Sequence, residues 1–554
     1  MPKRRNDNEL SQNGLTKRPR STDPGTAADH FSSLSNEVLL HILSFLPIPS
    51  LTTCQRLSRR FHALAGDSEL WKRQYFSKWV RPRARRLAVA RRTSFPLSKT
   101  EYSPRVSTWL DHGHLDRSKR ITNWKRQYHL RHNWSKGICR VTQVEIPQPP
   151  RSPLLVTLCA GFVFTADSQG GLRAWSSEKP ETFKAELSFS DLDPLPTPTT
   201  LTAACGPDPH YIEVMVGFED GILRVFRMDM MRLRLDLRFS TKSAQGAITA
   251  IAASYPYLIA VSELMVLSLY RLPGTMDDLP RSDEAAHLIT SLKADNMRSP
   301  MSLSIRLAGP DIVASVVYSF HHLGCGWSLG IQELHFDTTG QQLSSRLTTT
   351  VDTQYGIVKL YLPSSKNGPP STPSRSIPHS HATPLKPTIL HQDPPTSISY
   401  SHPYLLTSHM DNTLTLYLVV SNSERLFVKG GRRLWGHTSS VSAVRVSDRG
   451  KAVSVSSRGD EVRIWELESS ISLLGTHKTS QCENSIKVEA DRQTTSTDDE
   501  RLELLTGTPS SSLLVDAPNK LAQAKYCIGF DDERLLLLRR RERGAQLIEF
   551  YDFT

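Results

Sequence analysis

Residues 31–79 read FSSLSNEVLLHILSFLPIPSLTTCQRLSRRFHALAGDSELWKRQYFSKW, a pattern that predicts three short helices. The first begins after Ser35, a good helix-capping residue, and its apolar residues recur at helical spacing until Pro47 and Pro49 end it. A second helix is expected from about Ser50 to Leu64. A third is expected after Asp67.

These helices carry more apolar surface than they can bury among themselves. Val38 with Ile42, and Leu39 with Leu43, lie on diverging faces of the first helix. Three helices of this length bury too little surface to fold stably alone. The surplus fits docking onto a partner's helices or packing against the rest of the chain, and periodicity leaves both open.

The segment resembles an F-box, the motif that binds the Skp adaptor of cullin–RING ubiquitin ligases. The residues that match in order and spacing are Leu34, Glu37, Ile42, Leu43, Leu46-Pro47, Leu51, Cys54, Arg59, Phe61 and Leu70-Trp71. F-boxes usually have Leu-Pro where this chain has Leu34-Ser35. The missing proline makes the segment before the first helix less rigid. The resemblance implies that the adaptor binds Leu34, Glu37, Val38, Ile42, Leu43, Leu46, Pro47, Leu51, Leu57, Phe61, Leu70 and Trp71.

Composition indicates a soluble globular protein with more than one domain, since the chain has 554 residues, of which 38% are hydrophobic and 22% charged. No apolar run approaches the roughly 18 residues of a membrane span, and the polar N-terminus is unlike a signal peptide. The seven cysteines are scattered without a CxxC pair. They are expected to be reduced thiols in the nucleus or cytosol, with no zinc site or disulfide framework.

The net charge of +13 is concentrated near the N-terminus. Residues 72–140 hold 19 Lys/Arg against 3 Asp/Glu, whereas residues 141–554 hold 40 against 45. A nucleic-acid-binding body would need its basic surface in the large C-terminal part. The charge distribution therefore argues against a protein whose C-terminal part binds nucleic acid.

Residues 1–30 are expected to form a disordered basic tail. Its clusters Lys3-Arg4-Arg5 and Lys17-Arg18-Pro19-Arg20 resemble a bipartite nuclear localisation signal. Residues 80–138 are expected to form a basic helical linker, with Trp124, Tyr128 and either Arg131 or His132 on one face. This stretch resembles the linker of F-box/WD-repeat proteins. We favour a rigid spacer with solvated arginines over a phosphate- or acid-binding patch.

Residues 139–554 change to short β runs separated by turn signals. The clearest unit, LWGHTSSVSAVRVSDRGKAVSVSSRGDEVRIWEL at 434–467, resembles a WD repeat because of its Gly436-His437…Trp465 frame. An unrelated antiparallel sandwich would not need that frame. Comparable strand endings recur seven times and predict a seven-bladed propeller: Trp175, Phe226, Tyr270, Phe336, Tyr417, Trp465 and the C-terminal LIEFYDF.

Two insertions and a closing strand complete the predicted propeller. Residues 363–395, with nine prolines, are expected to be a loop that cannot pair as a strand, and residues 478–520, rich in Ser, Thr, Asp and Glu, to be disordered. A strand near 140–146 is expected to pair with 547–553. This pairing would complete the last blade and close the ring.

The sequence contains no phosphate-binding glycine loop, GxSxG or HExxH motif, and predicts no catalytic, metal or cofactor residues. His321-His322 near Cys325 fits a hairpin turn better than a metal site. The residues expected to stabilise the WD blades are His437, Asp220, Asp411 and Trp465. Gly459 occupies the usual turn-aspartate position, with Asp460 one residue late, which predicts an incomplete network.

Arg458 is the one possible substrate-face residue. Some F-box/WD proteins place an arginine at this position to hold a phosphorylated target, because a guanidinium can bond two phosphate oxygens at once. The equivalent positions in two other blades are Glu219 and Met410. A solvated loop arginine is therefore the default interpretation.

Together these features predict a multidomain α plus all-β protein: a small three-helix F-box, a helical linker and a seven-bladed propeller. The resemblance implies a non-catalytic substrate-recognition subunit of a Skp–cullin–F-box (SCF) ubiquitin ligase, in the nucleus and/or cytoplasm. It would bind the Skp adaptor, and through it the cullin and RING subunits, and hold a protein for ubiquitination and proteasomal degradation. No membrane, cofactor or small molecule is implied. The alternative is a nuclear WD-repeat scaffold that binds nucleic acid or phosphate through the basic linker.

Overall fold

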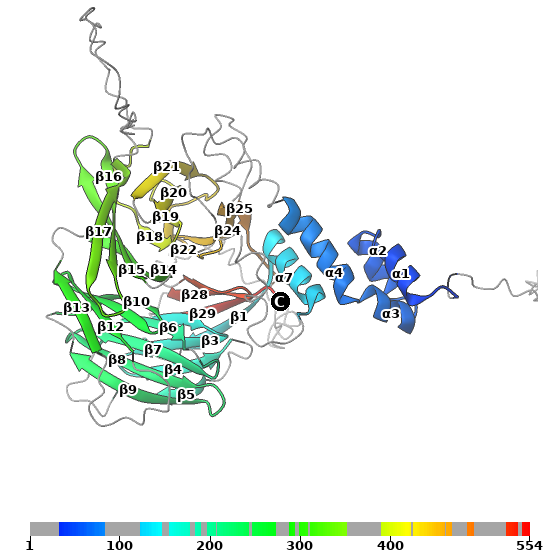
Figure 1. The fold of residues 1–554 in the computed structure, drawn as a ribbon, viewed down its shortest axis with the longest axis horizontal. Coiled ribbons are helices and arrows are strands. Elements are labelled where there is room, and N and C mark those ends of the chain that lie inside the picture. Colours follow the sequence, from blue (N-terminus) through cyan, green and yellow to red (C-terminus); the bar gives the residue numbers. More distant parts are fainter. Residues whose placement is uncertain are drawn as a thin grey trace, which may run out of the picture. The chain divides into compact units, whose positions relative to one another are not determined.

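The computed structural model of the chain describes most of the helices and strands predicted from the sequence (Figure 1). The described residues are 31, 33–82, 122–146, 154–177, 183–189, 197–206, 208–242, 246–272, 287–293, 298–308, 311–351, 389–422, 425–459, 461–467, 485–491, 528–540 and 546–554. The chain divides into two compact units, Met1–Val80 with Asn123–Lys125, and Arg81–Thr122 with Arg126–Thr554. Within the described ranges, no helix has the length and apolar character needed to cross a membrane.

The first unit is helical, as predicted, but residues 48–65 form two helices instead of one. The helices are α1 (Asn36–Leu43), α2 (Ile48–Cys54), α3 (Arg59–Ala65), α4 (Ser68–Tyr75) and the π-helical turn η1 (Phe76–Val80). Ser58 interrupts the expected second helix because its extended backbone lets the Ser58 hydroxyl accept a hydrogen bond from Phe61 N–H at 3.2 Å. Leu57 therefore lies in the connection and is exposed.

Both predicted N-caps of this unit are present. The Ser35 hydroxyl accepts from Val38 N–H at 3.5 Å, and Asp67 Oδ1 accepts from Glu69 N–H at 2.9 Å. The helices enclose a core of buried apolar side chains: Leu39, Leu43, Leu51, Phe61, Leu64, Ala65 and Leu70. Arg60 bonds the carbonyl oxygen of Leu34 at 2.6 Å, which ties α3 to the segment before α1.

The second unit contains seven sheets, which confirms the predicted propeller. Six sheets follow the sequence and pair as antiparallel neighbours. In chain order their strands are β2 (Leu155–Cys159), β3 (Phe162–Asp167), β4 (Gly171–Ser176), β5 (Phe183–Leu187); β6 (Pro198–Cys205), β7 (Tyr211–Phe218), β8 (Ile222–Asp229), β9 (Arg234–Lys242); β10 (Ile248–Ser254), β11 (Tyr257–Ser262), β12 (Val266–Arg271), β13 (His287–Lys293); β14 (Arg298–Ala308), β15 (Asp311–His322), β16 (Gly326–Phe336), β17 (Gln342–Thr349); β18 (Ser397–Ser401), β19 (Tyr404–Ser408), β20 (Leu414–Ser421), β21 (Leu426–Leu434); and β22 (Val441–Val446), β23 (Lys451–Ser456), β24 (Val462–Glu466), β25 (Ser485–Lys487).

The seventh sheet joins the two ends of the propeller sequence, as predicted. Its strand order is β26-β1-β29-β28-β27, from β26 (Glu489–Asp491), β1 (Ile138–Ile146), β29 (Gln546–Asp552), β28 (Arg534–Arg540) and β27 (Ile528–Phe530). Strand β1 pairs antiparallel with β29 from Arg140↔Asp552 to Ile146↔Gln546. In Figure 1, β1 in cyan accordingly lies beside the red strands β28 and β29.

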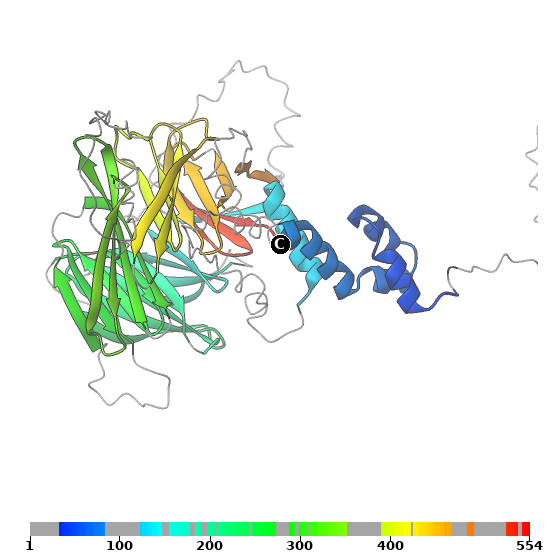
Figure 2. The same cartoon turned by 45° about the horizontal axis from the view of Figure 1, so that its top comes forward.

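Each aromatic ending predicted from the sequence falls in or directly after the third strand of a sheet, from Trp175 in β4 to Phe553 after β29. The ring also closes through the first strands, because β27 contacts both β22 and β2. Figure 2 shows the fourth and fifth sheets, in green and yellow, standing side by side. Apolar side chains fill the spaces between sheets and stabilise the ring by burial.

The predictions for the two insertions need correction at the residues that the structure describes. Residues 485–491 were expected to be disordered, but they form β25 and β26, and β26 pairs in parallel with β1. Within the proline-rich segment, His391 forms a bridge with Gly326, and its carbonyl accepts from Trp327 N–H at 2.9 Å. Residues 363–388, 478–484 and 492–520 lie outside the described ranges.

Helix α7 (Trp124–Lys136) leads into β1. In the second unit, Trp134 stacks on Phe553 with ring centroids 3.9 Å apart, and Asn133 Nδ2 donates to the Phe553 carbonyl at 2.9 Å. Gly137 then turns the chain with φ +73°, where an added Cβ would lie 2.4 Å from the Lys487 carbonyl oxygen. The C-terminal part of α7 is therefore fixed to the closing sheet.

Candidate functional site

The structure sorts the predicted adaptor-binding residues into a core set and a surface set. The buried ones, which shape the fold of the first unit, are Leu43, Leu51, Phe61, Leu70 and Trp71. The half-buried ones are Leu34, Ile42 and Leu46, and the exposed ones are Glu37, Val38, Pro47 and Leu57. Periodicity could not separate these groups because both faces of the helices are apolar.

Exposed apolar side chains of this unit include a group along α1 and the turn after it, apart from Phe31 and Leu57. Val38 is 46% exposed and Phe45 is 68% exposed, while Ile42, which lies between them at helical spacing, is half-buried. The His41 ring contacts Phe45 edge-on at 5.0 Å, and the Arg73 guanidinium lies 5.7 Å from the Phe45 ring. We call Val38, Ile42 and Phe45 the α1 surface. The sequence analysis missed Phe45, although its i+7 spacing from Val38 was visible.

The first turn of α7 belongs to the first unit and packs on α4 and η1. Trp124 contacts Tyr75 and Phe76 with centroid distances of 5.5 and 5.7 Å, and Lys125 Nζ donates to Gln55 Oε1 at 2.8 Å. Trp124 and Tyr128, predicted to share a helical face, are both buried. Residues 83–121, which hold most of the basic linker, and residues 1–30 lie outside the described ranges.

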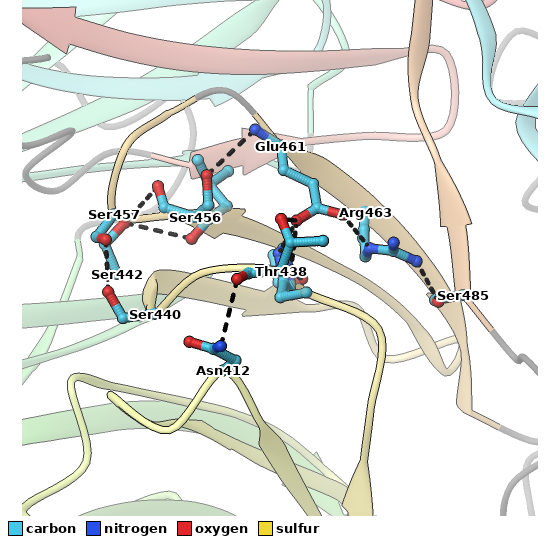
Figure 3. A network of polar contacts seen from close by, with 12 residues as sticks. Asn412, Thr438, Ser440, Ser442, Ser456, Ser457, Glu461, Arg463 and Ser485 are labelled. Atoms are coloured by element: carbon cyan, nitrogen blue, oxygen red, sulfur yellow. Dashed lines mark hydrogen bonds and ion pairs between the residues drawn. The ribbon is translucent and has the colours of Figure 1, made fainter. Parts of the chain in front are cut away.

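In the sixth sheet, His437 and Trp465 share the Ser454 hydroxyl, and Glu461, which the sequence analysis missed, lies beside them. Ser454 Oγ lies 2.6 Å from His437 Nε2 and accepts from Trp465 Nε1–H at 2.8 Å. Glu461, whose side chain is buried, accepts from Thr438 N–H at 2.9 Å and from Arg463 Nε–H at 2.7 Å (Figure 3).

Glu461 thus brings a buried carboxylate to this turn. Its Oε2 also lies 3.4 Å from His437 Nδ1. Burial opposes ionisation, but the Thr438 N–H and the Arg463 guanidinium outweigh it and lower the pKa of Glu461 to about 2. Gly459, in the expected aspartate position, adopts φ +72°, and Asp460 lies outside the described residues.

Asp220 and Asp411 hold the corresponding turns of the second and fifth sheets. Asp220 Oδ1 accepts from Ile222 N–H at 2.9 Å. Asp411 Oδ1 accepts from the Thr413 hydroxyl at 2.6 Å, and its other oxygen lies 3.4 Å from Arg433 Nη1. Both aspartates therefore accept hydrogen bonds within their turns.

One face of the propeller collects exposed apolar residues. Because successive strands are antiparallel, loops from second to third strands share a face with loops that lead from one sheet to the next. We call the face that carries these loops the B–C face, where B and C stand for the second and third strands of each sheet. Its exposed large apolar residues, from 46% for Leu390 to 98% for Leu323, are Leu264, Leu323, Leu390, Met410 and Trp435.

These five residues belong to three consecutive sheets, the third to the fifth, and their connections. The corresponding turns of the first, second and sixth sheets carry Gln169, Glu219 and Arg458 instead. Arg458 is exposed in the β23–β24 turn, and within the described residues no hydrogen bond or ion pair holds it. The B–C face is thus apolar on one side and polar on the other.

The predicted hairpin position of His321 and His322 is confirmed. Both end β15, and His322 Nδ1 accepts from Gly324 N–H at 3.2 Å in the turn to β16. Across the ranges that the structure describes, no three His, Cys, Asp or Glu side chains gather as metal ligands would.

Comparisons with known proteins match both units. Residues 31–77 match the F-box-like family, and residues 139–554 match the family described as F-box protein pof12 beta-propeller. The chain is 22% identical over 458 residues to F-box protein pof12 of Schizosaccharomyces pombe, covering 79% of this chain and 84% of that protein.

Two further similarities are more limited. Over 47 residues the chain is 43% identical to F-box protein dre-1 of Caenorhabditis elegans, covering 8% of this chain and 5% of that protein. Among solved structures, the C-terminal WD40 domain of Sif2 matches with 13% identity and a TM-score of 0.33, covering 60% of this chain and 73% of that one.

The four-helix unit with its exposed α1 surface and the seven-sheet propeller thus correspond to the two matched families. The propeller match alone spans well over half of the sequence. This chain is an F-box protein with a β-propeller, and it belongs to the F-box protein pof12 beta-propeller family.

Proposed function

We propose that this chain is the substrate-recognition subunit of an SCF ubiquitin ligase. Its first unit would bind a Skp-type adaptor and its propeller would hold a target protein. The observation that carries the proposal is the α1 surface, where Val38 and Phe45 remain exposed on a unit that matches the F-box-like family. Exposed aromatic and aliphatic side chains on a small helical unit are typical of a protein-binding surface.

The α1 surface is suited to receive apolar helices from an adaptor. Phe45 contacts both the His41 ring and the Arg73 guanidinium, and Arg73 Nη1 also donates to Ser44 Oγ at 2.9 Å. An aromatic ring that is already positioned loses little conformational entropy on binding. The polar groups around it would form the rim that surrounds an apolar centre.

The proposal gives the chain no chemical step in ubiquitin transfer. An adaptor-bound receptor raises the effective concentration of target lysines beside the charged conjugating enzyme. The contribution of this chain would be affinity for two partners at once. The expected consequence for a bound target is ubiquitination and proteasomal degradation.

The apolar half of the B–C face supports target binding at the third to fifth sheets. Leu264, Leu323, Met410 and Trp435 offer apolar contacts there, and Trp is a residue type that often dominates binding energy. Arg458 lies on the polar half in the sixth sheet. We therefore favour an apolar segment of the target as the main contact, with Arg458 as a possible second contact for an acidic or phosphorylated group.

The test of adaptor binding must use surface residues. Leu43 is 1% exposed, so Leu43→Asp would unfold the helical unit and could not separate binding from folding. The informative variant is the full-length chain carrying Val38→Asp and Phe45→Asp. Met231→Asp is the matched control, because Met231 is 75% exposed in the propeller.

Adaptor binding is measured by co-purification of these proteins with a recombinant Skp adaptor. The wild type and Met231→Asp should retain the adaptor, whereas Val38→Asp/Phe45→Asp should lose at least about tenfold in affinity, the effect of removing roughly 1.4 kcal/mol of contact energy. Circular dichroism should show unchanged helix content in all three. Full adaptor binding by the double variant would overturn the proposed docking surface.

We also propose nuclear and cytoplasmic localisation. The two basic clusters in residues 3–20 support import. Replacing Lys17, Arg18 and Arg20 by alanine in a fluorescently tagged full-length chain should move the protein towards the cytoplasm. An unchanged distribution would remove the basis of this proposal.

A further inference from the structure

Two thiols meet at the junction between the first and second sheets. Cys159 ends β2 and Cys205 ends β6, and their sulfur atoms are 3.8 Å apart. Cys205 is exposed and Cys159 is half-buried, and both are reduced. The pair lies on the propeller face opposite the B–C face, because first strands end at the loops that join them to second strands.

The hairpins at this position fix the two thiols. Cys159 is followed by a two-residue turn in which Ala160 and Gly161 have φ +48° and +79°, and Cys159 pairs with Phe162 across it. Cys205 pairs with Ile212, and Asp208 Oδ1 accepts from His210 N–H at 2.9 Å in the turn between β6 and β7. The backbones of both hairpins are therefore held by these turns.

The separation of the sulfur atoms matches a dithiol that can close. A disulfide bond measures about 2.05 Å, so rotation of the cysteine side chains must bring the sulfurs closer by somewhat less than 2 Å. Among the residues that the structure describes, no set of three metal-ligating side chains includes these thiols. A close pair of thiols in the described part of the propeller suits a disulfide better than the three or four ligands of a metal ion.

The other described cysteines lack this arrangement. Cys325 is buried, and burial raises the pKa of Cys139 to about 12, which keeps it in the unreactive thiol form. Cys54 lies half-buried in the helical unit. Cys205 is the most accessible of the five described thiols, and Cys159 is the neighbour that could resolve its oxidised form.

We propose that Cys159 and Cys205 form a reversible redox-modification site, which a hydroperoxide closes into a disulfide between the first two blades. The Cys205 thiol loses its proton, and the thiolate attacks one oxygen of hydrogen peroxide and breaks the O–O bond, which gives a sulfenic acid and a hydroxide that takes up the proton as water. The Cys159 thiolate, after loss of its own proton, then attacks the sulfenic sulfur and forms the S–S bond, and the displaced hydroxide takes up that proton as a second water. Two electrons pass from the two sulfurs to the peroxide.

The bond would connect strands that no sheet hydrogen bond connects, since β2 and β6 belong to different sheets. It would enclose residues 160–204 and restrict opening of the ring between the first two blades. Reversible disulfides in reducing compartments are typically redox sensors. This inference is independent of the proposed adaptor and target binding.

The test is peptide mapping of the purified full-length chain. The protein is treated with hydrogen peroxide, its remaining thiols are alkylated, and it is digested without reductant. A peptide containing Cys159 should be linked to one containing Cys205, and dithiothreitol should release both. Cys159→Ser and Cys205→Ser should each abolish the linked peptide, whereas Cys54→Ser should retain it.

A thermal scan provides the second readout. Oxidised wild type should melt at a higher temperature than reduced wild type, and Cys159→Ser/Cys205→Ser should show no such shift. Independent oxidation of the two thiols without a linked peptide would overturn the proposal. Linkage that forms only after unfolding, or equally with other cysteines, would overturn it as well.

Discussion

At the scale of single residues, Glu461 contributes hydrogen bonds to a turn although the WD-repeat pattern of the sequence does not predict it there. The expected position holds Gly459, and the carboxylate comes instead from the residue directly before β24. From there Glu461 bonds Thr438 in the preceding connection and Arg463 in its own strand. Its role depends on the path of the turn, which spacing alone does not define.

Replacing Glu461 by glutamine should destabilise the propeller. The substitution removes the charge that Arg463 and Thr438 contact in a buried position, at an expected cost of about 2–4 kcal/mol. Guanidinium unfolding should show a lower midpoint. Glu219→Gln, an exposed glutamate in the equivalent turn of the second sheet, should leave the midpoint unchanged. Equal midpoints for the two variants would contradict the role of Glu461.

His391 and His409 form a buried stacked pair, with ring centroids 3.8 Å apart. Burial, and then the nearby Arg433 charge, lowers the pKa of His391 to about 4. Burial and the facing His391 lower the pKa of His409 to about 3, although Asp411 favours the charged form. The unfolded chain therefore binds protons from about pH 6.5 downwards, while the folded chain does not. Stability should fall as pH drops from 6.5 towards 4.

His409→Gln tests this pH dependence. Between pH 7.5 and pH 5 the wild type should lose about 2 kcal/mol of stability through His409, and the variant should lose correspondingly less. Denaturant unfolding at both pH values gives the difference. His210→Gln, at an exposed position, should lose stability like the wild type. A wild-type pH dependence in His409→Gln would show that the buried ring does not resist protonation.

At the scale of secondary-structure elements, β1 joins the two ends of the propeller sequence. Its seven-residue register with β29 closes the last sheet, and β26 extends that sheet on the other side. The expected closure of the last blade by residues 140–146 predicted β1. The three-residue strands β25 and β26 could not be predicted, because their polar sequence pairs only once β24 and β1 are in place.

Proline substitutions in β1 should open the ring. Hydrogen-bonded and non-bonded positions alternate along an antiparallel pair, so adjacent prolines at Thr142 and Gln143 must remove at least one bond to β29. The expected loss is about 3 kcal/mol or more. Thermal unfolding should show a lower melting temperature than in the matched variant with two alanines. Equal melting temperatures would mean that β1 does not lock the propeller.

The helical unit shows a second limit of sequence reasoning at this scale. Leu43 and Phe45 are two residues apart, yet Leu43 is buried in the core while Phe45 is exposed. Apolar character predicted the helices but not which apolar side chains remain on the surface. The interruption at Ser58 was equally hidden, because Leu57 continues the helical spacing of the segment. Only the packed structure separates the fold-forming residues from the α1 surface.

At the scale of the whole molecule, the chain combines two surfaces of similar chemistry in separate units. The α1 surface presents Val38 and Phe45, and the apolar half of the B–C face presents Leu323 and Trp435. The two units, the number of blades and the ring closure were all predicted from the sequence. The apolar B–C face was not, because its residues come from loops of three sheets that only the fold brings together.

The central claim is that both surfaces act in one molecule to mark the same targets. It is tested most directly by measuring ubiquitinated lysines by mass spectrometry in cells in which the chain is replaced by one of three forms. These are Val38→Asp/Phe45→Asp, Leu323→Asp/Trp435→Asp, and the control Met231→Asp. We predict that the first two lose ubiquitination on the same set of proteins, and that the control retains it. Loss on unrelated sets, or no loss in either variant, would contradict the claim.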